Sequence, residues 1–142
     1  MVKPIYFSFK ELVESETAEK KGIDNTPSWE VVDHLKELAL FLDGLRYAWG
    51  SAINVSSGYR CEELNKAVKG SKTSVHKIGY AADLYPANGD IRRFKQFVVK
   101  WLDKKHFDQC LKEKNSKGQE WVHIGLYSNS GEQRRIVKDM EV

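Results

Sequence analysis

The sequence predicts an α+β fold in which helices pack against a small, mostly antiparallel sheet. Two segments, one starting near Ser28 and one near Ile91, carry apolar residues at helical spacing. The segments after residue 105 instead resemble three strands joined by two short polar connections. The sequence contains no internal repeat and no linker. Helices packed on one sheet is therefore the simplest architecture.

Length and charge limit the classes of protein to consider. The chain has 142 residues, enough for one hydrophobic core but not for two, so we expect a single domain over residues 1–142. The net charge is +3 and the lysines are scattered among acidic residues, which argues against a nucleic-acid partner. No apolar run is long enough to span a membrane, and no signal peptide is visible. We expect a monomer without a membrane partner. Cys61 and Cys110 form no CxxC pair and are predicted to be free thiols.

Capping signals define the helices of the N-terminal third. Ser8 precedes Glu11 by three residues, the spacing of a capping box, so "FSFKELVES" predicts a short helix. "TAEKKGIDNTPS" is predicted to be a loop. A long helix is predicted to begin near Ser28 and to end near Gly50. Its buried face is formed by Val31, Leu35, Leu38, Leu42, Leu45 and Trp49.

Strands and helices then alternate before the chain becomes strand-rich. "AINVSS" and "YAADLYP" predict two strands, and "RCEELNKAV" between them predicts a short helix. Asp90 is predicted to cap the helix "IRRFKQFVVKWLDK". The buried face of this helix comprises Ile91, Phe94, Phe97, Val98, Trp101 and Leu102. "HFDQCLKE", "EWVHIGLYS" and "RRIVKDMEV" predict three more strands, with hairpin connections at "KNSKG" and "NSGEQ".

Two of the four histidines lie in segments that favour a functional site. His34 falls off the apolar face of its helix and His106 follows a lysine pair, so both are predicted to be solvated surface residues. His76 precedes a run of small residues that begins at Gly79, where backbone or ligand could approach closely. His123 lies on a predicted strand.

His76, Asp83 and His123 could together supply two imidazoles and one carboxylate, a ligand set typical of catalytic zinc. Glu120, three residues before His123, is a candidate general base. Because side chains alternate along a strand, Glu120 faces away from His123 unless the strand bends or bulges. Taken singly, His76 is more often a turn residue, Asp83 a cap and Glu120 a solvated charge. These residues alone leave a metal site and an ordinary surface both open.

Longer motifs favour the metal site. The pattern S-x-H-x-x-G-x-A-x-D is matched without a gap from Ser74 to Asp83, and E-x-x-H follows at Glu120 to His123. Together with "SGYRCEELN" and "FDQCLKE", these motifs resemble the zinc D-Ala-D-Ala peptidase family over nearly the whole chain. That family holds bacterial D-alanyl-D-alanine carboxypeptidases, D,D-dipeptidases and phage endolysin peptidases. The chain is most similar to its small bacterial and phage members.

The resemblance implies a fold like that of hedgehog proteins and D-Ala-D-Ala peptidases, with one zinc ion as cofactor. By position it assigns His76, Asp83 and His123 as zinc ligands, Glu120 as catalytic base, Arg60 as the substrate-binding arginine, and Ser74 and Gln109 as neighbours of the site.

The implied function is a zinc peptidase that hydrolyses peptide bonds in peptidoglycan stem peptides or cross-bridges. Carboxypeptidase, dipeptidase and endolysin endopeptidase activities all remain open. The alternative is a non-catalytic, zinc-stabilised binding domain of the same fold, as in hedgehog proteins. Retention of Glu120 and Arg60 favours the enzyme. Without a visible signal peptide, we expect either an endolysin that stays cytoplasmic until it is released to the cell wall, or a periplasmic enzyme whose sequence is truncated.

Overall fold

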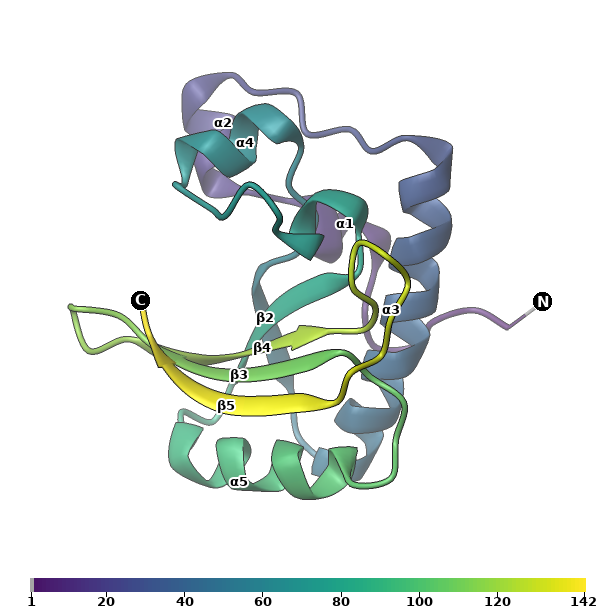
Figure 1. Ribbon diagram of the computed structural model, residues 1–142, viewed down its shortest axis with the longest axis vertical. Helices are drawn as coiled ribbons and strands as arrows, with labels where there is room; N and C mark the ends of the chain where they lie inside the picture. The colour runs from purple at the N-terminus through teal and green to yellow at the C-terminus, as the bar shows by residue number, and fades with distance from the viewer. Residues whose placement is uncertain (1) are drawn as a thin grey trace.

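The computed structural model describes residues 2–142 and contains a five-stranded sheet packed with helices (Figure 1). In chain order the elements are α1 (Phe9–Val13), α2 (Glu16–Lys21), α3 (Trp29–Trp49), β1 (Ile53–Ser57), α4 (Glu62–Ala67), the 3-10 helix η1 (Val75–Ile78), β2 (Ala81–Pro86), α5 (Ile91–Leu102), β3 (Gln109–Lys114), β4 (Glu120–Gly125) and β5 (Ile136–Glu141). The predicted α+β class is confirmed. Within residues 2–142 the helices are too short or too polar to cross a bilayer.

The helices begin and end at the predicted capping residues. The hydroxyl of Ser8 accepts a hydrogen bond from the amide of Glu11 at the start of α1, and Ser28 caps α3 in the same way. Asp90 caps α5. Gly50 ends α3 in the left-handed region with φ of 79°, which a residue without a Cβ adopts at little cost.

Helix α2 lies in the segment that was predicted to be a loop. Ser15 caps its first turn by accepting from the amide of Ala18, and Gly22 ends it in the left-handed conformation. The helix has only six residues, which is too short to produce an apolar period that stands out in the sequence. It packs against α4, above the sheet (Figure 1).

The sheet has the strand order β1-β2-β4-β3-β5. All neighbouring strands are antiparallel except β3 and β5, which are parallel. The "KNSKG" connection is a hairpin between β3 and β4, as predicted. The predicted "NSGEQ" hairpin is wrong, because β5 passes β4 and pairs with β3.

A buried carboxylate explains the position of β5. Asp108, 1% exposed, accepts hydrogen bonds from the backbone amide of Arg134 and from two nitrogens of its guanidinium. The amide of Arg135 also donates to the carbonyl of Phe107. These contacts fix the returning chain beside the start of β3, so that β5 runs parallel to it.

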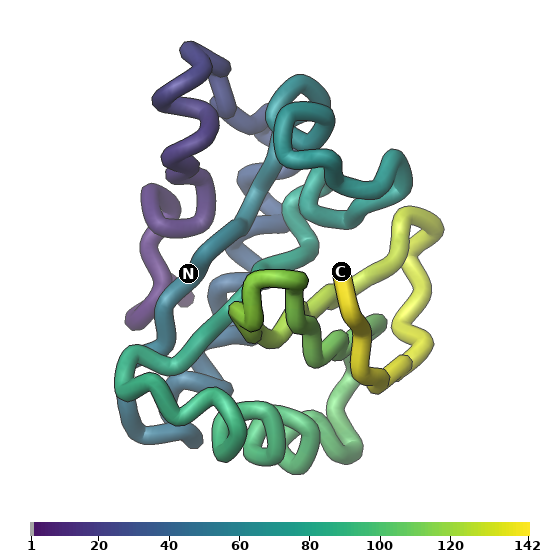
Figure 2. Tube along the Cα trace, turned by 90° about the vertical axis from the view of Figure 1, so that its left-hand side faces the viewer, coloured from purple at the N-terminus to yellow at the C-terminus, as the bar shows by residue number. Residues whose placement is uncertain are grey.

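The two faces of the sheet have different neighbours. Helix α5 runs under one face, at the bottom of Figure 2, while α1 and α2 lie at the upper left. The core lies between the sheet face that α5 covers and helices α3 and α5. It contains Leu35, Leu38, Leu42, Leu45, Ala82, Leu84, Phe94, Val98, Leu102, Cys110, Val122 and Ile124. Because side chains alternate along a strand, Asp83 and His123 project from the opposite face.

Candidate metal centre

Three potential metal ligands converge on the sheet face opposite α5. One ligand atom from each of His76, Asp83 and His123 lies within 4.8 Å of the other two, and all three residues are buried. Asp83 on β2 and His123 on β4 are directly paired across the two antiparallel strands, which places their side chains side by side. His76 is added from η1, the 3-10 helix that leads into β2.

The ring of His76 is oriented by backbone contacts. Its Nδ1 lies 2.7 Å from the carbonyl oxygen of Gly58, and since a carbonyl can only accept, Nδ1 carries the proton. Nε2 is then unprotonated and has a lone pair that can bind a metal. It lies 3.3 Å from the carboxylate of Asp83. In return, the carbonyl of His76 accepts from the amide of Arg60, while Ser74 Oγ accepts from the amide of His76. Hydrogen bonds at the ring and at the backbone thus lock this candidate ligand in place.

Glycine is required at the end of the 3-10 helix that presents His76. Gly79 has φ of 82°, and a Cβ at this position would lie 2.9 Å from Val31 on α3. The close approach of η1 to α3 therefore accounts for one of the small residues in the motif.

The surroundings of Asp83 favour its ionised carboxylate. Burial alone would raise its pKa, but the hydrogen bond from His123 holds the pKa well below its usual range. Its Oδ1 lies 3.0 Å from Nδ1 of His123. Burial lowers the pKa of His76, which favours the neutral imidazole. Two imidazoles and one carboxylate, buried and converging, fit a divalent metal such as zinc with an open coordination position.

Arg60 borders this cluster. Its NH2 lies 3.5 Å from Oδ2 of Asp83. Its Nε donates to Ser57 Oγ. The pairing of β1 with β2 shifts between Val55 and Ser57, so that Ser57 comes opposite Asp83. This bulge brings the hydroxyl to the arginine.

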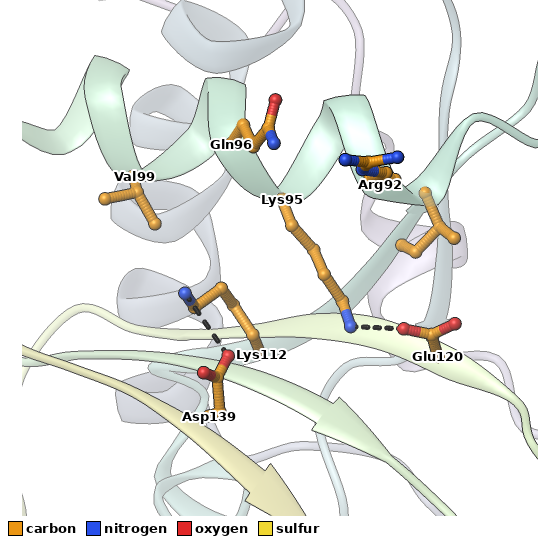
Figure 3. A pocket seen from close by; sticks show the side chains of 8 residues that line it. Arg92, Lys95, Gln96, Val99, Lys112, Glu120 and Asp139 are labelled. Carbon is orange, nitrogen blue, oxygen red and sulfur yellow. Dashed lines mark hydrogen bonds and ion pairs between the residues drawn. The ribbon is translucent and has the colours of Figure 1, made fainter.

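Glu120 does not lie at the cluster. Its carboxylate is 2.6 Å from Nζ of Lys95 on α5, on the other face of the sheet, where both residues line a surface pocket (Figure 3). The pairing of β3 with β4 is continuous from Glu120 to Gly125. The irregularity needed to turn Glu120 toward the metal is therefore not found, and the prediction that placed it there disagrees with the structure.

Glu113 occupies the position expected for Glu120. It lies on β3 opposite Trp121 and shares a face with His123. Its Oε1 accepts a hydrogen bond of 3.0 Å from Trp121 Nε1 and lies 4.0 Å from His123 Nδ1. Burial, followed by the charge of Asp83, raises the pKa of Glu113.

A sequence signal for Glu113 does exist. The "KNSKG" hairpin pairs Lys114 with Glu120, so alternation places Glu113 and Trp121 together on the face of His123. Glu113 was not among the predicted site residues, because the E-x-x-H motif points only to the glutamate three residues before His123.

The remaining predictions concerned Gln109, two further histidines and the two cysteines. Gln109 begins β3 opposite Gly125, on the same face as Glu113. His106 is exposed. His34 is not a solvated residue as predicted, since it is partly buried, stacks on Tyr80 and lies 2.6 Å from the carbonyl of Ile78. Cys61 and Cys110 are free thiols.

Comparison with known proteins gives one result. A family model described as Peptidase M15 matches residues 5–125. This range contains the three clustered ligands together with Arg60 and Glu113. A search of curated proteins finds no match.

Proposed function

The chain belongs to the peptidase M15 family, and from this premise we propose that it is a zinc-dependent peptidase with His76, Asp83 and His123 as metal ligands. The convergence of these three side chains on one sheet face carries the proposal. A zinc ion bound there would polarise a substrate carbonyl and acidify a nearby water.

Glu113 is the general base of the proposed reaction. Its Oε1 is held by Trp121 close to His123, so the carboxylate can reach a water at the metal ligands. Glu113 takes the proton of the attacking water and later gives it to the leaving amine of the cleaved peptide bond. Burial raises the pKa of Glu113, which makes its carboxylate a stronger proton acceptor.

Arg60 stabilises the negative charge that develops on the carbonyl oxygen under attack. It reaches the edge of the cluster beside Asp83, and its side chain is 15% exposed. A fixed guanidinium in such a partly buried position can donate to an oxyanion without reorganising at the moment of reaction.

The proposed substrate is a peptide of peptidoglycan, either a stem peptide or a cross-bridge. The motif from Ser74 to Asp83, which resembles that of the small bacterial and phage D-Ala-D-Ala peptidases, supports this choice. The carboxypeptidase, dipeptidase and endopeptidase alternatives release different products, so one experiment can distinguish them.

The test is incubation of the zinc-loaded protein with purified peptidoglycan, followed by mass spectrometry of the soluble products. Free D-alanine would indicate a carboxypeptidase, a dipeptide a dipeptidase, and larger peptides with new amino termini an endopeptidase. A chelator should abolish release, and added zinc should restore it.

The matched control is the Glu113→Gln variant, which should bind zinc but release little product. A wild-type protein that binds zinc stoichiometrically and cleaves neither peptidoglycan nor its isolated stem peptides would contradict the peptidase and support the binding domain.

A further inference from the structure

We propose that Asn65 is a positioning residue, which holds the guanidinium of Arg60 in the orientation that faces the metal cluster. This inference rests on the proposed peptidase function, in which Arg60 contacts the substrate. Asn65 lies on α4 and is 2% exposed. Its side chain forms hydrogen bonds with Arg60 and Ser71 rather than with the three clustered residues.

The side-chain amide of Asn65 has a fixed orientation. Its Oδ1 accepts from NH1 of Arg60 at 3.2 Å, and its Nδ2 donates to the carbonyl of Ser71 at 2.9 Å. A flipped amide would set a donor against the guanidinium and an acceptor against the carbonyl. Both neighbours therefore require the same orientation.

Asn65 supplies one of two anchors that leave the third guanidinium nitrogen pointing at the cluster. Nε of Arg60 donates to Ser57 Oγ at 3.0 Å, NH1 donates to Asn65, and NH2 lies 3.5 Å from Asp83. Because the guanidinium is planar and rigid, fixing Nε and NH1 fixes the direction of NH2.

The backbone of Arg60 is held by other groups. Asn25 accepts from the amide of Cys61 and donates to the carbonyl of Tyr59, on either side of Arg60. The amide of Arg60 itself donates to the carbonyl of His76. Loss of the Asn65 side chain should therefore release the guanidinium while the backbone stays in place.

Gly70 shows how closely the neighbouring loop encloses this pair. A Cβ at Gly70 would lie 2.1 Å from Oδ1 of Asn65 and 2.8 Å from NH1 of Arg60. Backbone so near to the contact leaves no space there for another side chain, so the carbonyl oxygen of Asn65 is the acceptor available to NH1 on that side.

The decisive experiment is a double-mutant cycle on kcat/KM with a stem-peptide substrate. Asn65→Leu should lower kcat/KM about tenfold, as expected for loss of one hydrogen bond to a charged group. In an Arg60→Ala background the same change should cost less than about twofold, because Asn65 acts through Arg60. Asn65→Asp keeps an acceptor for NH1 but sets its second carboxylate oxygen against the carbonyl of Ser71, so it should recover part of the loss.

Two measurements separate positioning from a structural role. An arginine-selective proton–nitrogen NMR spectrum should show the Nε–H signal of Arg60 moving toward that of solvent-exposed arginines in Asn65→Leu, but not in Asn65→Asp. Asn129→Ala is the matched control, because Asn129 donates to the carbonyl of Thr73 in the same loop without touching Arg60. It should leave both readouts unchanged.

Equal losses from Asn65→Leu in the wild-type and Arg60→Ala backgrounds would overturn the proposal. So would an unchanged Arg60 signal in a folded Asn65→Leu protein. If that variant does not fold, the Asn65→Asp protein still tests the idea, since a lost Arg60 signal there would contradict it. The NMR readout needs no catalysis, so an inactive wild-type protein would refute the peptidase and leave the contact testable.

Discussion

The β3–β4 hairpin carries one glutamate on each face, and the two have opposite surroundings. Glu113 lies beside the buried ligands and is held by Trp121, whereas Glu120 pairs with Lys95 at the surface near α5. Burial raises the pKa of the first, while the hydrogen bond and charge of Lys95 lower that of the second. The face of the strand, rather than distance along the sequence, decides which carboxylate lies beside the proposed metal ligands.

The largest effect is expected from removing one of the three proposed metal ligands. His123→Ala should lose bound zinc on dialysis and reduce peptide hydrolysis below detection, because two ligands hold the metal far more weakly than three. Metal content by mass spectrometry and product release measure both effects. His106→Ala, at an exposed histidine, is the control. Full zinc occupancy in His123→Ala would remove this residue from the ligand set.

Exchange of the carboxyl for an amide at Glu113 should have the next largest effect. Glu113→Gln keeps the size of the side chain and the bond from Trp121, but it cannot take a proton. We expect kcat to fall by roughly 10²–10⁴-fold while zinc stays bound. Steady-state kinetics on zinc-loaded protein measure the loss. Activity close to that of the wild type would show that the base lies elsewhere.

A smaller loss is expected when Glu113 is left in place but loses its anchor. Trp121→Phe retains an aromatic ring and removes the N–H that donates to Glu113. We expect kcat to fall about tenfold, the scale of one hydrogen bond to a charged group. The same substitution in a Glu113→Gln background should have little further effect, and a full additional loss would assign Trp121 another role.

The smallest effect is expected on the opposite face. Glu120→Gln should leave kcat/KM within about twofold and lower the free energy of unfolding by at most ~1 kcal/mol, as for surface ion pairs. Because pairing lowers the pKa of Glu120, this contribution is present above about pH 4.3 and is lost as the pH falls further. Denaturant titrations at pH 7 and pH 3 would test it. A loss of activity as large as that of Glu113→Gln would reverse the comparison.

Local rules predicted most of the elements and the three clustered residues. Ser8, Ser28 and Asp90 cap helices where the sequence places them, because a cap depends on residues only three positions apart. The partner of β5 was not predictable in this way. Its position depends on Asp108, which holds Arg134 26 residues further along the chain. Glu113 was missed for a related reason, since its proximity to His123 arises from strand pairing.

Two hydrogen bonds join His76 to the segment from Gly58 to Arg60, and one of them makes metal binding measurable at a backbone amide. The amide of Arg60 can exchange its hydrogen with solvent only when its bond to the carbonyl of His76 opens. A metal that binds only the closed form should slow this exchange by the factor 1 + [metal]/Kd. Hydrogen exchange at one backbone amide would thus follow metal occupancy without any need for a substrate.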